Sequence, residues 1–183
     1  MSGSSGAISD VKFDDTNYTQ NPDYIIIEGG TNDADLIGSA LGETLPAAFG
    51  TYTLGDYTST FTNTTYCGAI EKMFKSLANT VKTAKVGVII APKMGQLNAS
   101  ITDYTAEHNN RRRYFETLIE LCEKWGIPCL NLWDKSILNP MMPSQYTYQQ
   151  ESNVGKYYTD GQHLTTEGYD YVSPIIEAWM KTL

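Results

Sequence analysis

Two groups of polar residues in this chain have types and spacings suited to acyl-transfer chemistry. The first is Asn32, within Gly29–Asp33 directly after an apolar run, and the second is His163, three residues after Asp160. A side-chain amide such as that of Asn32 can donate a hydrogen bond to an oxyanion. An imidazole beside a carboxylate can act as a general base toward a hydroxyl nucleophile. Together the two groups supply every part of an acyl-transfer centre except the nucleophile.

The candidate base, His163, depends on its neighbour Asp160. Within a turn, a carboxylate three residues earlier is close enough to accept from the ring Nδ1–H, which leaves Nε2 free to take a proton. The same carboxylate stabilises the imidazolium that forms. The alternative is a surface histidine near the start of a helix. We favour the base, because the chain has two histidines and this one shares a short turn with a carboxylate.

The candidate oxyanion donor, Asn32, follows a predicted strand at the position where an open parallel sheet gathers its ligands. Removing such a donor typically lowers a rate by about a hundredfold or more. The alternative is that Asn32 and Asp33 form a turn after the strand, as this pair often does. The spacing alone does not choose between these two roles.

Apolar runs and helical periodicities alternate along the chain and would position these residues. Runs typical of buried parallel strands lie at residues 24–28, 86–91 and 127–132. Apolar residues recur at helical spacing over residues 67–84, 105–125 and 165–182. This alternation predicts an α/β fold with right-handed crossovers and helices on both faces of a parallel sheet.

Two long polar stretches, residues 38–65 and 136–159, interrupt this pattern and carry many of the tyrosines. Loops of this length in a compact domain are usually functional or disordered, and their aromatic content favours function. Tyrosine faces could hold sugar or acyl groups, or the tyrosines could simply cover the edge of the sheet. Both interpretations stay open on the sequence.

The composition indicates one domain over residues 1–183, with 41% hydrophobic and 19% charged residues. A net charge of −8 argues against a nucleic-acid surface. One basic cluster, Arg111–Arg113, opens a predicted helix and is followed by Glu116, Glu120 and Glu123. We interpret this cluster as a solvated helix face, in preference to a phosphate or polysaccharide contact.

Three cysteines, Cys67, Cys122 and Cys129, lack the spacing of a zinc site or a redox motif. We expect buried free thiols. No apolar stretch is long enough to span a membrane. No signal peptide is visible, and the compartment stays open on the sequence.

The two groups of polar residues resemble conserved blocks of one family. Gly29–Asp33 after an apolar strand is similar to the third block of the SGNH (GDSL-type) hydrolases. Asp160–Leu164, followed by Thr-Thr-Glu-Gly-Tyr, is similar to their fifth block. The preceding run of residues 21–27, Asn-Pro-Asp-Tyr-Ile-Ile-Ile, is typical of the approach to the third block. The resemblance covers essentially the whole chain in order.

The resemblance implies a flavodoxin-like three-layer α/β/α sandwich and hydrolysis of esters, often lipids or acetylated sugars, without a metal or other cofactor. Asn32 would then be an oxyanion donor, while His163 and Asp160 would belong to a catalytic triad. We expect a small acyl ester or an acetylated carbohydrate as substrate. The alternative function is a non-catalytic SGNH-like module that binds glycan through the tyrosine-rich stretches.

The second block of the family contributes a backbone N–H to the oxyanion hole from a glycine in a Ser-Gly pair. Ser2-Gly3 stands 27 residues before Gly30, close to the family's spacing. Gly3 is therefore the expected second donor, with Gly6 a poorer match.

The first block of the family, which carries the nucleophilic serine, has no counterpart here. Ser2, Ser4 and Ser5 lie nearest to the expected region, but none follows a strand that could present it. We therefore identify no nucleophile and expect an N-terminally incomplete domain. In the family the first strand lies beside the strand corresponding to residues 24–28. We accordingly expect an unpaired apolar edge there, covered by a missing segment or by self-association.

Overall fold

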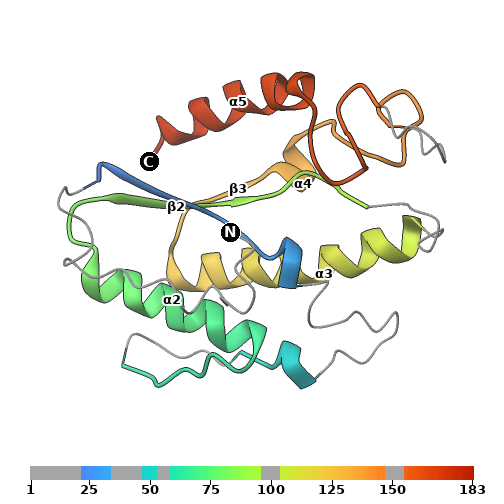
Figure 1. Ribbon diagram of the computed structural model, residues 1–183. Helices are drawn as coiled ribbons and strands as arrows, with labels where there is room; N and C mark the ends of the chain where they lie inside the picture. The colour runs from blue at the N-terminus through green and yellow to red at the C-terminus, as the bar shows by residue number, and fades with distance from the viewer. Residues whose placement is uncertain (1–21, 34–46, 53–57, 96–103, 147–154) are drawn as a thin grey trace.

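The computed structural model describes five parts of the chain, residues 22–33, 47–52, 58–95, 104–146 and 155–183. A parallel sheet forms the middle layer, with α2 and α3 packed on one face and α5 on the other (Figure 1). The three-layer α/β fold predicted from the sequence is confirmed. The amino-terminal candidates Ser2, Gly3, Ser4, Ser5 and Gly6 lie outside the described residues.

The sheet has the strand order β1-β2-β3, and both neighbouring pairs are parallel. Its strands are β1 (Tyr24–Glu28), β2 (Lys85–Ile90) and β3 (Cys129–Asn131). Ile26 pairs with Gly87, and Ile89 pairs with Leu130. Because all three strands run the same way, the segments that follow them emerge at one edge of the sheet. We call this the carboxyl edge.

Three long helices cover the sheet in the described ranges, and a shorter helical segment lies before α2 and another directly after β3. They are α2 (Tyr66–Thr80), α3 (Tyr104–Trp125) and α5 (Thr166–Met180), with η2 (Ala47–Phe49) and α4 (Leu132–Lys135). Threonines cap α2 and α5, because the side chain of Thr65 accepts from the N–H of Gly68 and that of Thr165 accepts from the N–H of Gly168. Among these helices, none is long and apolar enough to cross a bilayer.

Strand alternation divides the core between the two faces of the sheet. On β2, Val88 and Ile90 pack with α2 and α3, whereas Ile89 packs with the residues under α5. β1 is less enclosed, with Ile25–Ile27 only half-buried. Within the described ranges β1 pairs with β2 alone.

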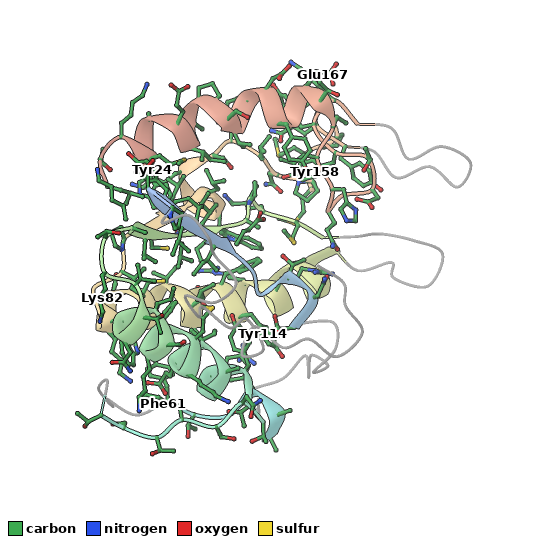
Figure 2. All side chains as sticks on the ribbon, turned by 60° about the vertical axis from the view of Figure 1, so that its left-hand side comes forward. Tyr24, Phe61, Lys82, Tyr114, Tyr158 and Glu167 are labelled. Atoms are coloured by element: carbon green, nitrogen blue, oxygen red, sulfur yellow. The ribbon has the colours of Figure 1, made fainter. Side chains whose placement is uncertain are left out.

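The structure shows where two of the tyrosines in the long polar stretches lie and whether the cysteines are buried. Tyr146 and Tyr158 are buried in the cluster beneath α5, so these two tyrosines cover the sheet instead of offering their faces to a ligand. Figure 2 shows Tyr158 beneath α5. Cys67 and Cys122 are buried free thiols, as predicted, and Cys129 is a free thiol that is half-buried.

Candidate active site

The predicted contact between His163 and Asp160 is present in the structure. Asp160 Oδ2 lies 2.6 Å from His163 Nδ1. Its other oxygen, Oδ1, accepts the backbone N–H groups of Gln162 at 2.9 Å and His163 at 2.7 Å. Gly161 has a φ of +84°, a left-handed conformation that glycine adopts without strain. One carboxylate therefore shapes the turn with one oxygen and holds the imidazole with the other.

This contact decides which nitrogen of the ring is available. An ionised carboxylate only accepts hydrogen bonds, so Nδ1 carries the proton and Nε2 of the neutral ring has a free lone pair. The His163 side chain is 65% exposed, whereas that of Asp160 is 25% exposed. The ring is therefore open to a reacting molecule while its partner is shielded. A ring held in this way can accept a proton at Nε2.

The electrostatics of Asp160 favour the ionised form. Burial alone would raise the pKa of this carboxyl, but the backbone N–H of His163, the His163 ring and the backbone N–H of Gln162 all donate to it. The donors outweigh burial and hold the pKa of Asp160 below its ordinary value of 3.8.

Replacing Asp160 with asparagine is expected to destabilise the protein by about 1 kcal/mol at pH 7, because charge-assisted hydrogen bonds become neutral ones. The contribution of an Asp with a lowered pKa is complete above its unfolded-state pKa and is lost as the pH falls through the folded-state pKa. The difference in unfolding free energy from wild type should therefore shrink below pH 4. Urea titrations at pH 7 and in steps below pH 4 measure it. A difference that stays constant into acid would contradict the stated role of the carboxylate.

The Asp160–His163 turn is attached to the end of β2. The hydroxyl of Tyr158 donates to the carbonyl of Lys93 at 2.6 Å. The backbone N–H of Gly95 donates to the carbonyl of Gly161 at 3.0 Å. In Figure 1 the segment before α5 correspondingly descends to the end of β2. The imidazole therefore belongs to the carboxyl edge of the sheet.

Asn32 lies in a single helical turn, residues 31–33, directly after β1. The turn is entered through Gly30, which is buried and has a φ of +99°, and a Cβ there would lie 3.1 Å from the Tyr66 hydroxyl. A residue with a side chain would be strained at this position. Asn32 itself is exposed, and Asp33 is half-buried. Burial raises the pKa of Asp33, and a hydrogen bond from its own backbone N–H opposes part of this rise.

Arg111 joins the Asn32 turn to the end of β2. Its Nη1 donates to the carbonyl of Thr31 at 3.2 Å and lies 3.9 Å from Met94 Sδ. Met94 precedes Gly95, which is bonded to the Asp160–His163 turn. A continuous series of contacts therefore connects the two turns that carry the candidate residues, and both lie at the carboxyl edge.

Our interpretation of Arg111–Arg113 as a solvated helix face is wrong for Arg111. This residue is 2% exposed and belongs to the core, whereas the Arg112 side chain is 56% exposed and pairs with Glu116 at 2.7 Å. The sequence did contain the signal. Counting three, four and seven residues on from Arg111 gives Tyr114, Phe115 and Leu118, which are all buried. The apolar face of the helix therefore begins one turn earlier, at an arginine.

The part of the chain that the structure describes contains neither a serine bonded to the candidate base nor a metal-binding group. None of its serine hydroxyls is hydrogen-bonded to the ring of His163, and its acidic, cysteine and histidine residues form no group suited to a metal ion. A shallow hollow beside α3 and β3 contains neither Asn32 nor His163. It is lined by Arg112, Phe115, Glu116, Ile119, Asn131, Trp133 and Asp134.

No protein-family model and no curated protein matches the sequence. Solved structures do match the fold. A protein from Lactobacillus plantarum is 17% identical with a TM-score of 0.57, and the match covers 91% of this chain and 71% of that one. A possible lipase from Chitinophaga pinensis is 15% identical with a TM-score of 0.57, covering 87% of this chain and 73% of that one.

A third structure, a GDSL-like lipase from Bacteroides thetaiotaomicron, is 21% identical with a TM-score of 0.47, covering 88% of this chain and 64% of that one. At such identities the first two likenesses establish a shared α/β fold. A shared fold does not by itself establish a shared function.

Proposed function

We propose that the protein is an ester hydrolase of the SGNH type that acts on small acyl esters or acetylated carbohydrates. His163 is the general base, Asp160 orients it, and Asn32 donates to the oxyanion. The observation that carries this proposal is the 2.6 Å contact between His163 Nδ1 and Asp160 Oδ2, in a turn bonded to the end of β2. The possible lipase from Chitinophaga pinensis, which shares the fold, agrees with this proposal.

The reaction begins when Nε2 of His163 takes the proton of a serine hydroxyl as its oxygen attacks the ester carbonyl. A carbon–oxygen bond forms, and the carbonyl oxygen becomes an oxyanion that accepts from the Asn32 amide. Asp160 stabilises the imidazolium, which then protonates the departing alkoxide as the ester bond breaks. Water, deprotonated by the same ring, releases the acid from the acyl-enzyme. By the family resemblance, the backbone N–H of Gly3 is a second oxyanion donor.

The fixed orientation of the imidazole favours this role over that of a surface histidine. Asp160 Oδ1 already fixes the turn through two backbone N–H groups. The contact of Oδ2 with the ring is not needed for the turn, and its effect is to select the tautomer of the ring. In a histidine with no catalytic role, fixing the orientation of a ring that is 65% exposed would add little stability.

The nucleophile can be identified by a fluorophosphonate, which forms an oxygen–phosphorus bond to an activated serine as fluoride leaves and the base takes the proton. In the protein extended at its amino terminus to include the expected nucleophile segment, we expect one phosphonyl group on one serine, located by peptide mass spectrometry. The rate of labelling should fall at least about a hundredfold in His163→Ala. Glu167→Gln, an exposed change in the first turn of α5, serves as control.

Labelling that does not depend on His163, or no labelling together with no hydrolysis of activated acetyl esters, would contradict the esterase proposal. The non-catalytic glycan-binding module would then be favoured. The burial of Tyr146 and Tyr158 weakens that alternative, because these rings cannot face a sugar.

A further inference from the structure

We propose that Arg111 is the positioning residue of the candidate site, holding the turn of residues 31–33, and with it Asn32, against the end of β2. In its catalytic part this inference rests on the proposed function. That Arg111 holds this turn in place is inferred from contacts of the described residues and does not depend on ester hydrolysis.

The first reason is the burial of the charge. Arg111 is 2% exposed and is among the largest fully buried side chains of the protein. Removing a guanidinium from water is costly unless hydrogen bonds replace its hydration, so a buried arginine in a small domain has a specific partner to hold. Arg112, the next residue along α3, has a largely exposed side chain. Of these two neighbouring arginines, Arg111 alone is buried.

The second reason is what the guanidinium contacts. Nη1 donates to the carbonyl of Thr31, one residue before Asn32, and lies 3.9 Å from Met94 Sδ. The N–H of Gly95, next to Met94, donates to the carbonyl of Gly161 in the turn that carries His163. Arg111 therefore stands where the segments from β1 and β2 meet, and the second of these is bonded to the turn before α5.

The third reason is that Asn32 needs external support. A single helical turn has too few internal hydrogen bonds to persist by itself. Asn32 is exposed, so its own side chain is not fixed by packing. A donor displaced by about 1 Å can cost on the order of a hundredfold in rate. The planar, permanently charged guanidinium can contact a carbonyl and a second segment at the same time. The compact ammonium group of lysine cannot contact both.

The first test is a double-mutant cycle in ester hydrolysis. Arg111→Met should lower kcat by about 10- to 100-fold with KM within about twofold, because an interaction made in the transition state is displaced. Arg111→Lys should lie between Arg111→Met and wild type, and the exposed control Arg112→Met should change kcat by less than about twofold. In an Asn32→Ala background, Arg111→Met should cost less than about threefold, because the two residues act as one unit.

The second test does not need activity. Hydrogen exchange followed by mass spectrometry should show amide exchange at least about tenfold faster in Arg111→Met over residues 29–33 and 91–95, with residues 166–180 unchanged. If Arg111→Met does not fold, Arg111→Lys is measured in the same way and should show the same regional pattern.

The outcomes separate the two proposals. Unchanged exchange over residues 29–33 would overturn the positioning role whether or not the protein hydrolyses esters. Additive losses of kcat in the cycle would show that Arg111 does not act through Asn32 and would also overturn it. A protein that hydrolyses no ester but shows the regional change in exchange would contradict the esterase proposal and retain Arg111 as the residue that holds the turn.

Discussion

Replacing His163 with alanine is expected to lower kcat/KM for an activated short-chain ester by about 10⁴-fold. The change removes the group that takes the proton of the nucleophile and later protonates the leaving alkoxide. It leaves the oxyanion donors in place, so a small residual rate above that of the uncatalysed reaction should remain. Release of p-nitrophenolate from p-nitrophenyl acetate measures both rates.

The control for this experiment is Glu167→Gln, which lies four residues beyond His163 at an exposed position and should retain the wild-type rate. Circular dichroism of His163→Ala should match wild type, because the exposed ring contributes little to the core. Equal rates for wild type and His163→Ala would mean that the hydrolysis does not pass through this imidazole.

Replacing Asn32 with alanine is expected to lower kcat by about 10²- to 10³-fold, because the developing oxyanion loses a donor that is already in place. KM should change little, since the donor acts mainly after the carbonyl oxygen has gained charge. Steady-state kinetics on the same ester separate the two constants.

Two further substitutions distinguish an oxyanion donor from a residue that merely forms the turn. Asn32→Asp and Asn32→Gly are both compatible with a turn, but neither supplies the side-chain amide donor. We expect both to lose at least as much activity as Asn32→Ala, and Asn32→Asp the most, because its charge repels the oxyanion. If Asn32→Asp retained the wild-type kcat, Asn32 would be a turn residue only.

Features that depend on residues close together in the chain were the ones best predicted from the sequence. Residues 24–28 were predicted as a strand and form β1, because Asn-Pro-Asp at residues 21–23 and the two following glycines bound the apolar run on both sides. The contact between Asp160 and His163 was predictable because it spans three residues within one turn. The helix predicted over residues 67–84 ends earlier, since α2 stops at Thr80 and Val81 is extended.

Long-range and capping effects escaped prediction. α4 was missed because the strand predicted over residues 127–132 ends at Asn131, whose side chain accepts the N–H of Asp134 and starts a helix. The hydrogen bond between Gly95 and Gly161 joins segments far apart in the chain, and no local pattern encodes it. Arg111 was predicted to be solvated because of its charge, although its helical spacing places it on the apolar face of α3.

We propose that Asn32 and His163 face one reaction centre at the carboxyl edge of the sheet, and a crystal structure of the fluorophosphonate-treated protein would show whether they do. We expect phosphorus bonded to a serine oxygen, a phosphonyl oxygen about 2.7–3.1 Å from the Asn32 amide nitrogen, and His163 Nε2 within hydrogen-bond reach of the serine oxygen. An adduct remote from both residues, or Asn32 and His163 on separate faces of the molecule, would contradict it.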